Sequence, residues 1–163
     1  QLESLSLNGT QIQDVSSLVA LKRLRWLDLR ATRVTDLSPL AELTNLETLA
    51  LNMTGVSDLA PLADLKRLVW LDLSGTDVTD LSQLSGLSEL QSLNLVRTKV
   101  ADLSPLVSLT NLQWLDISET SVVDVFPLAE LERLQVLSVV GIEITQGLGV
   151  LSSLSLRGCW IHR

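Results

Sequence analysis

The sequence predicts an α/β repeat solenoid, in which short parallel strands stack into one sheet and tight helical turns lie on the opposite side. The first observation is a leucine pattern, L-x-x-L-x-L-x-x-T, that recurs every 22 residues along the 163-residue chain. Units of this length are too small to fold alone and bury their apolar side against their neighbours. The second is that apolar and polar residues alternate at the same place in each unit, as in a half-buried strand.

Seven units follow the pattern, and a partial unit is expected to begin at Leu151. The seven begin at Leu2, Leu24, Leu46, Leu68, Leu90, Leu112 and Leu134. The last of them, from Leu134 to Val150, has 17 residues instead of 22, with Ile142 in place of the threonine. Because the register is continuous, we expect residues 1–163 to form a single domain. Gln1 opens inside a repeat without a polar capping unit, so we expect the chain to be a fragment of a larger protein.

The strand of the second unit is expected around Leu27. The alternation of Trp26, Leu27, Asp28 and Leu29 predicts that the two leucines face the interior and that Trp26 and Asp28 face outward. Every unit runs in the same direction, so the strands should form a parallel sheet. The apolar residues of this unit that should be buried are Leu24, Leu27, Leu29, Val34, Leu37, Leu40 and Leu43.

The path back from each strand is short and is expected to contain a tight turn of 3₁₀ type. Ser38 directly precedes Pro39, which predicts that the serine caps this turn. An aspartate precedes each turn and is expected to accept backbone N–H groups. A calcium ladder is the alternative, although no second oxygen-ligand motif accompanies the column. The column comprises Asp14, Asp36, Asp58, Asp80, Asp102 and Asp124.

A threonine column lies where each strand ends and the chain turns. We expect each hydroxyl to bond the backbone of an adjacent coil, because a buried bend otherwise leaves backbone groups unpaired. The column comprises Thr10, Thr32, Thr54, Thr76, Thr98 and Thr120.

These units resemble leucine-rich repeats, and the D-[LV]-S-P-L segment after the strand is similar to that of internalin-type bacterial repeats. The resemblance covers nearly the whole chain, although threonine fills a column where asparagine is usual. It implies a horseshoe with a concave parallel sheet and short 3₁₀ or helical turns on the convex side. It also implies that the concave face of the sheet recognises a protein.

The outward strand positions repeat every 44 residues and predict a recognition surface. Trp26, Trp70 and Trp114 occupy the same outward position in alternate units, about 9–10 Å apart, and an aspartate follows each by two residues. A partner's lysine or arginine can stack on an indole and pair with the neighbouring aspartate. The residues expected to bind a protein or peptide are Trp26, Asp28, Arg30, Thr48, Asn52, Trp70, Asp72, Ser92, Asn94, Trp114 and Asp116.

Three alternatives to this interpretation remain open. The tryptophans could pack across strands over their small neighbours, with the period a by-product of repeat duplication. The row of indoles and carboxylates could instead bind a carbohydrate by stacking and hydrogen bonding. The chain could also be the regulatory sensor arm of a larger signalling or defence protein.

The residue inventory argues against an enzyme, and no cofactor is expected. The chain has one histidine and one cysteine, no tyrosine and no glycine-rich phosphate loop. Cys159 and His162 supply only half of a metal site. The net charge of −7 argues against nucleic acid as a partner. No apolar run is long enough for a transmembrane segment, and no signal peptide is visible. The location therefore stays open between the bacterial surface, secretion and the cytoplasm. The sequence also leaves the oligomeric state open.

Overall fold

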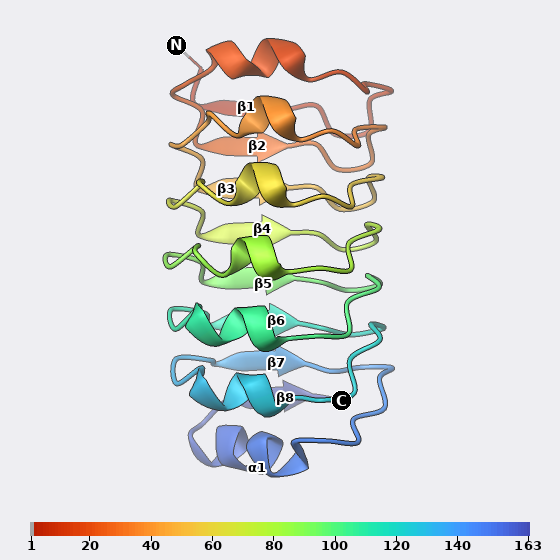
Figure 1. Ribbon diagram of the computed structural model, residues 1–163, viewed down its shortest axis with the longest axis vertical. Helices are drawn as coiled ribbons and strands as arrows, with labels where there is room; N and C mark the ends of the chain where they lie inside the picture. The colour runs from red at the N-terminus through yellow and green to blue at the C-terminus, as the bar shows by residue number, and fades with distance from the viewer. Residues whose placement is uncertain (1) are drawn as a thin grey trace.

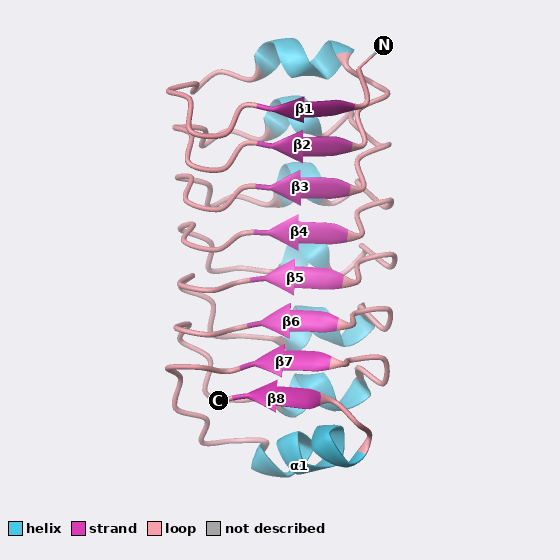
Figure 2. Ribbon diagram, turned by 180° about the vertical axis from the view of Figure 1, so that it is seen from behind, coloured by secondary structure: helices cyan, strands magenta, loops and turns pink. Residues whose placement is uncertain are grey.

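The computed structural model describes residues 2–163, whose strands form one eight-stranded parallel sheet in the order of the chain. Figure 2 shows the sheet face, with all arrows pointing the same way. The strands are β1 (Ser4–Ser6), β2 (Trp26–Asp28), β3 (Thr48–Ala50), β4 (Trp70–Asp72), β5 (Ser92–Asn94), β6 (Trp114–Asp116), β7 (Val136–Ser138) and β8 (Trp160–His162). The predicted parallel solenoid is therefore confirmed.

Helical turns cover the other side of the coils (Figure 1). They are the 3₁₀ helices η1 (Ser16–Ala20), η2 (Ser38–Leu40), η3 (Ala60–Leu62), η4 (Ser82–Leu84), η5 (Ser104–Ser108) and η6 (Phe126–Glu130), and the α-helix α1 (Leu148–Leu156). Proline at the start of four of these turns suits the first turn of a helix, where no intrahelical N–H bond is lost. No helix among residues 2–163 is long and apolar enough to cross a membrane.

Neighbouring strands pair in register, which aligns equivalent residues of successive units. Trp26 pairs with Thr48 and Thr48 with Trp70, while Leu27 pairs with Leu49. Each side chain of a strand therefore belongs to a column that runs across the sheet. A 22-residue repeat in the sequence becomes a step of one strand spacing, about 4.7–4.9 Å, in space.

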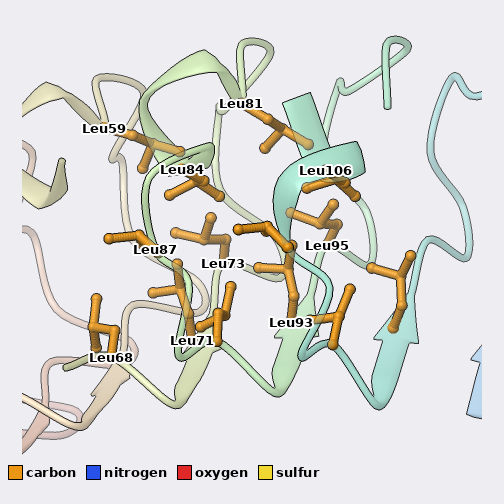
Figure 3. Close-up of a cluster of buried hydrophobic side chains, with 14 of the residues drawn as sticks. Leu59, Leu68, Leu71, Leu73, Leu81, Leu84, Leu87, Leu93, Leu95 and Leu106 are labelled. Carbon is orange, nitrogen blue, oxygen red and sulfur yellow. The ribbon is translucent and has the colours of Figure 1, made fainter. Parts of the chain in front are cut away.

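The core lies between the sheet and the 3₁₀ turns and consists of stacked aliphatic side chains. Figure 3 shows leucines of both layers, such as Leu71 and Leu93 from the strands and Leu84 and Leu106 from the turns, packed in this interior. The apolar residues predicted to be buried in the second unit are 0–1% exposed. Each fully buried leucine contributes about 1.5–3 kcal/mol, so stacking of the units supplies the core that one unit lacks.

The aspartate column holds the start of each 3₁₀ turn, as expected. Asp14 Oδ1 accepts the N–H of Ser16 at 2.8 Å, and Asp36 Oδ1 accepts that of Ser38 at the same distance. Ser38 itself is not the cap: Leu37 occupies the N-cap position, and the serine is the first residue of η2. The prediction of a serine cap was wrong because the side chain that holds the start of η2 is that of Asp36, which accepts the N–H of Ser38.

The threonine column bonds within its own coil and not to an adjacent coil, which corrects the prediction. Thr76 Oγ1 donates to the carbonyl of Leu73 at 2.5 Å, and Thr32 Oγ1 donates to that of Leu29 at 2.6 Å. The bond closes the turn that follows the strand, so the nearest acceptor lies three residues back.

The seventh coil is longer than the others, and Leu151 does not begin a new unit. Leu151 lies within α1, and Leu137 of β7 pairs with Ile161 of β8, a separation of 24 residues (161 − 137) instead of 22. On the return path of this coil, the α-helix α1 stands in place of a 3₁₀ turn. The break in the leucine spacing at Leu151 reflects the periodicity of this helix.

Candidate binding surface on the outer face of the sheet

A row of tryptophans crosses the outer face of the sheet. Trp26, Trp70 and Trp114 are the first residues of β2, β4 and β6, and all three are half-buried. The positions between them hold Thr48 and Ser92, which are smaller and also half-buried. The structure therefore places these predicted residues in one row, outside the aliphatic core.

A fourth tryptophan, Trp160, extends the row to β8. Trp160 pairs with Val136, which in turn pairs with Trp114, so it occupies the same outward position. It is 63% exposed, and its ring stacks on that of His162 with centroids 5.5 Å apart and planes 5° apart. The 44-residue spacing misses Trp160 because the seventh coil carries two extra residues. The match between Trp160-Ile161-His162 and Trp114-Leu115-Asp116 is the signal that could have found it.

The outer face is hollowed between the first two tryptophans. A shallow depression of about 430 Å³ is lined by Trp26, Arg30, Thr48, Ala50 and Trp70. The depression forms because β3 carries the smaller residues Thr48 and Ala50. At the same two positions, β2 and β4 carry tryptophan and aspartate. A side chain of a partner can enter this depression between two indole rings.

Asp28 lies on the outer face but is not available to a partner. Its carboxylate is 1% exposed, whereas half of the Arg30 side chain is accessible. Arg30 Nη2 approaches Asp28 Oδ2 at 2.9 Å, and the Arg30 backbone N–H donates to Oδ1 at 3.1 Å. The hydroxyl of Ser6 donates to Oδ2 at 3.3 Å. Arg30 and Asp28 were both predicted to contact a partner. In the structure, Arg30 covers the carboxylate of Asp28.

Asp72 and Asp116 each keep one carboxylate oxygen without a protein partner. In both residues Oδ1 accepts the N–H two residues later, from Ser74 and Ser118 respectively, at 2.9 Å. Neither Oδ2 atom has a hydrogen-bond partner among residues 2–163, and every buried side-chain oxygen in that range has one. Each Oδ2 atom therefore keeps some contact with solvent, although Asp72 as a whole is only 9% exposed and Asp116 is half-buried. The strand-end aspartates thus fix the turn with one oxygen and present the other.

The remaining predicted residues lie along the same face. Asn94 ends β5 and its Oδ1 accepts the N–H of Val96 at 3.1 Å, so it replaces aspartate without a charge. Asn52, just beyond β3, borders a second depression of about 480 Å³. The other residues of this second depression are Met53, Thr54, Ser74, Gly75, Val96 and Arg97.

Cys159 and His162 are not brought together as ligands. Cys159 is 4% exposed in the core, and burial raises the pKa of its thiol, whereas His162 stacks on Trp160 at the outer face. Within residues 2–163 no group of three or more histidine, cysteine, aspartate or glutamate side chains could hold a metal ion.

Comparison with known proteins gives one family and several solved structures. The family model for leucine-rich repeats (two copies) matches residues 22–64. An internalin (inlF) of Listeria monocytogenes is 31% identical with a TM-score of 0.89; the match covers 94% of this chain and 45% of that one. Internalin C2 (inlC2) of the same bacterium is 37% identical with a TM-score of 0.81, covering 83% and 60%. No curated protein matches in sequence.

A leucine-rich-repeat protein of Leptospira interrogans shares the fold, with 22% identity and a TM-score of 0.79 over 99% of this chain and 49% of that one. The chain thus spans about half the length of the solved proteins that it matches. Leucine-rich-repeat proteins generally serve as protein-interaction modules and are typically not enzymes. The repeat pattern, the stacked coils and these matches identify the chain as a leucine-rich-repeat protein that is similar to internalins.

Proposed function

We propose that the outer face of β2–β6 is a recognition surface that binds a protein or peptide, and that the chain is a binding module and not an enzyme. The observation that carries the proposal is the row of half-buried tryptophans, with an open depression between Trp26 and Trp70. Tryptophan is enriched among residues that dominate binding energy, because it buries a large apolar area with few rotamers to restrict.

The electrostatics of the surface support a partner with basic side chains. Asp72 and Asp116 each have one carboxylate oxygen without a hydrogen-bond partner among residues 2–163, on the same face as Trp70 and Trp114. A lysine or arginine placed there can stack on the indole and pair with the carboxylate. Asp28 is already paired with Arg30, so the basic side chains of a partner should bind at β4–β6 and not at β2.

The proposal is tested by selecting peptide ligands from a displayed random library on the wild-type chain. The selected ligands are then titrated against the triple variant Trp26→Ala, Trp70→Ala, Trp114→Ala. We expect affinity to fall at least about a hundredfold, since one central tryptophan alone is commonly worth about 2 kcal/mol or more. The matched control is Phe126→Ala, which removes an exposed aromatic residue from η6 on the opposite side of the coil.

The triple variant loses partly buried indole area but keeps the aliphatic core, so it should melt at a lower temperature yet stay folded under the conditions of the binding assay, which circular dichroism verifies. Ligands that bind both proteins equally would show that the tryptophan row only packs across the strands. A glycan array probed with the same pair separates the carbohydrate alternative, which would require glycan binding that the triple variant loses.

A further inference from the structure

The spacing of the tryptophan row restricts the shape of a ligand that lies along it. Trp26, Trp70, Trp114 and Trp160 occupy equivalent positions on β2, β4, β6 and β8. Because neighbouring strands are about 4.7–4.9 Å apart, the indoles recur every 9.4–9.8 Å or so, and the row spans about 28–29 Å. A ligand that uses the row must repeat its own contacts at this interval, in a direction across the strands.

Among regular peptide conformations, the polyproline II helix has this interval. It has three residues per turn and a rise of about 3.1 Å, so every third side chain returns to the same side after about 9.3 Å. In an extended β-strand, side chains on one side recur every 6.6–6.8 Å or so. One turn of an α-helix advances about 5.4 Å. The mismatch between polyproline II and the sheet is about 0.1–0.5 Å per repeat, small enough for several successive contacts.

The charges on the same face repeat at the same interval. Asp72 and Asp116 are the third residues of β4 and β6, two strands apart, and each has one carboxylate oxygen without a hydrogen-bond partner among residues 2–163. The intervening Asn94 is uncharged, and the outward positions of β4–β6 hold no basic side chain. A ligand that places a basic residue at every third position can therefore pair with both carboxylates at once.

We infer that this surface binds a proline-rich, basic segment in the polyproline II conformation, which lies across the strands along the solenoid. Proline enters the depression between Trp26 and Trp70. Lysine or arginine at every third residue pairs with Asp72 and Asp116. Polyproline II segments dock in aromatic-lined grooves because they lose little conformational entropy on binding. The inference rests on the proposed function and specifies the chemistry of the partner.

The test uses a synthetic peptide of four Pro-Pro-Lys triplets, about 37 Å long in polyproline II and thus long enough to span the row. Affinity is measured by isothermal titration calorimetry and by the change in tryptophan fluorescence. Two control peptides are titrated in parallel. One has the same composition in a permuted order without the three-residue period, and the other consists of four Gly-Gly-Lys triplets, which keep the charge spacing but not the conformation. We expect the Pro-Pro-Lys peptide to bind at least about tenfold more tightly than either.

Single variants of the protein locate the binding site. Trp70→Ala should weaken binding of the Pro-Pro-Lys peptide by tenfold or more, and Asp72→Asn by a smaller factor that disappears at high salt. Asparagine keeps the oxygen that accepts the N–H of Ser74, so the turn is preserved. Phe126→Ala on η6 should leave the affinity unchanged.

The outcomes distinguish this inference from the proposed function. Equal binding of the periodic, permuted and glycine peptides would overturn the inference, since charge alone would then explain the affinity. If the Pro-Pro-Lys peptide does not bind but library ligands depend on Trp70, the inference fails and the recognition surface stands. If no ligand of any kind depends on the tryptophans, both fail.

Discussion

Replacing Ala31 with glycine should stabilise the protein, because Ala31 has a left-handed backbone conformation with φ of 52°. It belongs to a column that directly precedes the threonines, and every member of this column has positive φ. Glycine fills three of the positions: Gly9, Gly75 and Gly141, with φ between 66° and 71°. The other four are Ala31, Met53, Arg97 and Glu119, with φ between 52° and 58°.

The magnitude follows from two opposing terms. A left-handed conformation costs a residue with a side chain about 1–2 kcal/mol, while glycine loses about 0.5–1 kcal/mol more than alanine when the backbone is ordered. Ala31→Gly should therefore raise the free energy of unfolding by about 0.5–1 kcal/mol. Gly75→Ala should lower it by a similar amount. The added methyl group would meet its nearest neighbour, Met53 Cγ, at 3.7 Å, an ordinary contact, so conformation alone sets this cost.

Urea unfolding followed by circular dichroism measures these differences from the midpoint, provided that the slope of the transition is unchanged. The control is Gly149→Ala, a glycine in α1 with open space around it and without positive φ, where alanine should stabilise the helix by up to about 1 kcal/mol. If Gly75→Ala and Gly149→Ala had the same sign, the assignment of strain to the column would be refuted.

Two further predictions concern the polar columns. Thr76→Val should lower the free energy of unfolding by about 0.5–1.5 kcal/mol, because the buried carbonyl of Leu73 loses the hydroxyl at 2.5 Å but keeps the N–H of Thr76 at 3.2 Å. Thr76→Ser, which keeps the hydroxyl, should cost less, and an equal loss would contradict the role of this bond. Hydrogen bonds from the N–H and then the hydroxyl of Ser16 lower the pKa of Asp14 from its ordinary value of 3.8, so its stabilisation is complete above that value and is lost as the pH falls through the lowered pKa. Urea unfolding measured between pH 7 and about pH 2.5 should show that the free energy of unfolding falls only below about pH 4. The fall should be shallower in Asp14→Asn. If the free energy of unfolding of Asp14→Asn fell with pH as it does in the wild type, that result would argue against this contribution.

The repeated elements of the fold could be predicted from the sequence because one physical requirement acts on every unit. Burial of an apolar side in a short coil dictates the alternation around Leu27 and Leu29, and the strand, turn and core follow from it. The aspartate column was also predictable, since an aspartate before a turn has few tasks other than accepting N–H groups.

The features that the sequence did not reveal depend on contacts between columns or on breaks in the period. The burial of Asp28 depends on the arginine two residues later, which folds back over it in this unit alone. The position of Trp160 depends on the extra length of the coil that contains α1. The left-handed column is hidden because only three of its seven members are glycine.

The recognition surface depends most directly on where the indole rings lie. Selective ¹⁵N labelling of the four tryptophans gives one indole N–H signal for each, and a soluble paramagnetic agent broadens the signals of groups near solvent. We predict that all four signals broaden, Trp160 most strongly, and that bound ligand protects those of Trp26, Trp70 and Trp114. Signals from these three residues that resist the agent in the free protein would place the rings in the interior and contradict the recognition surface.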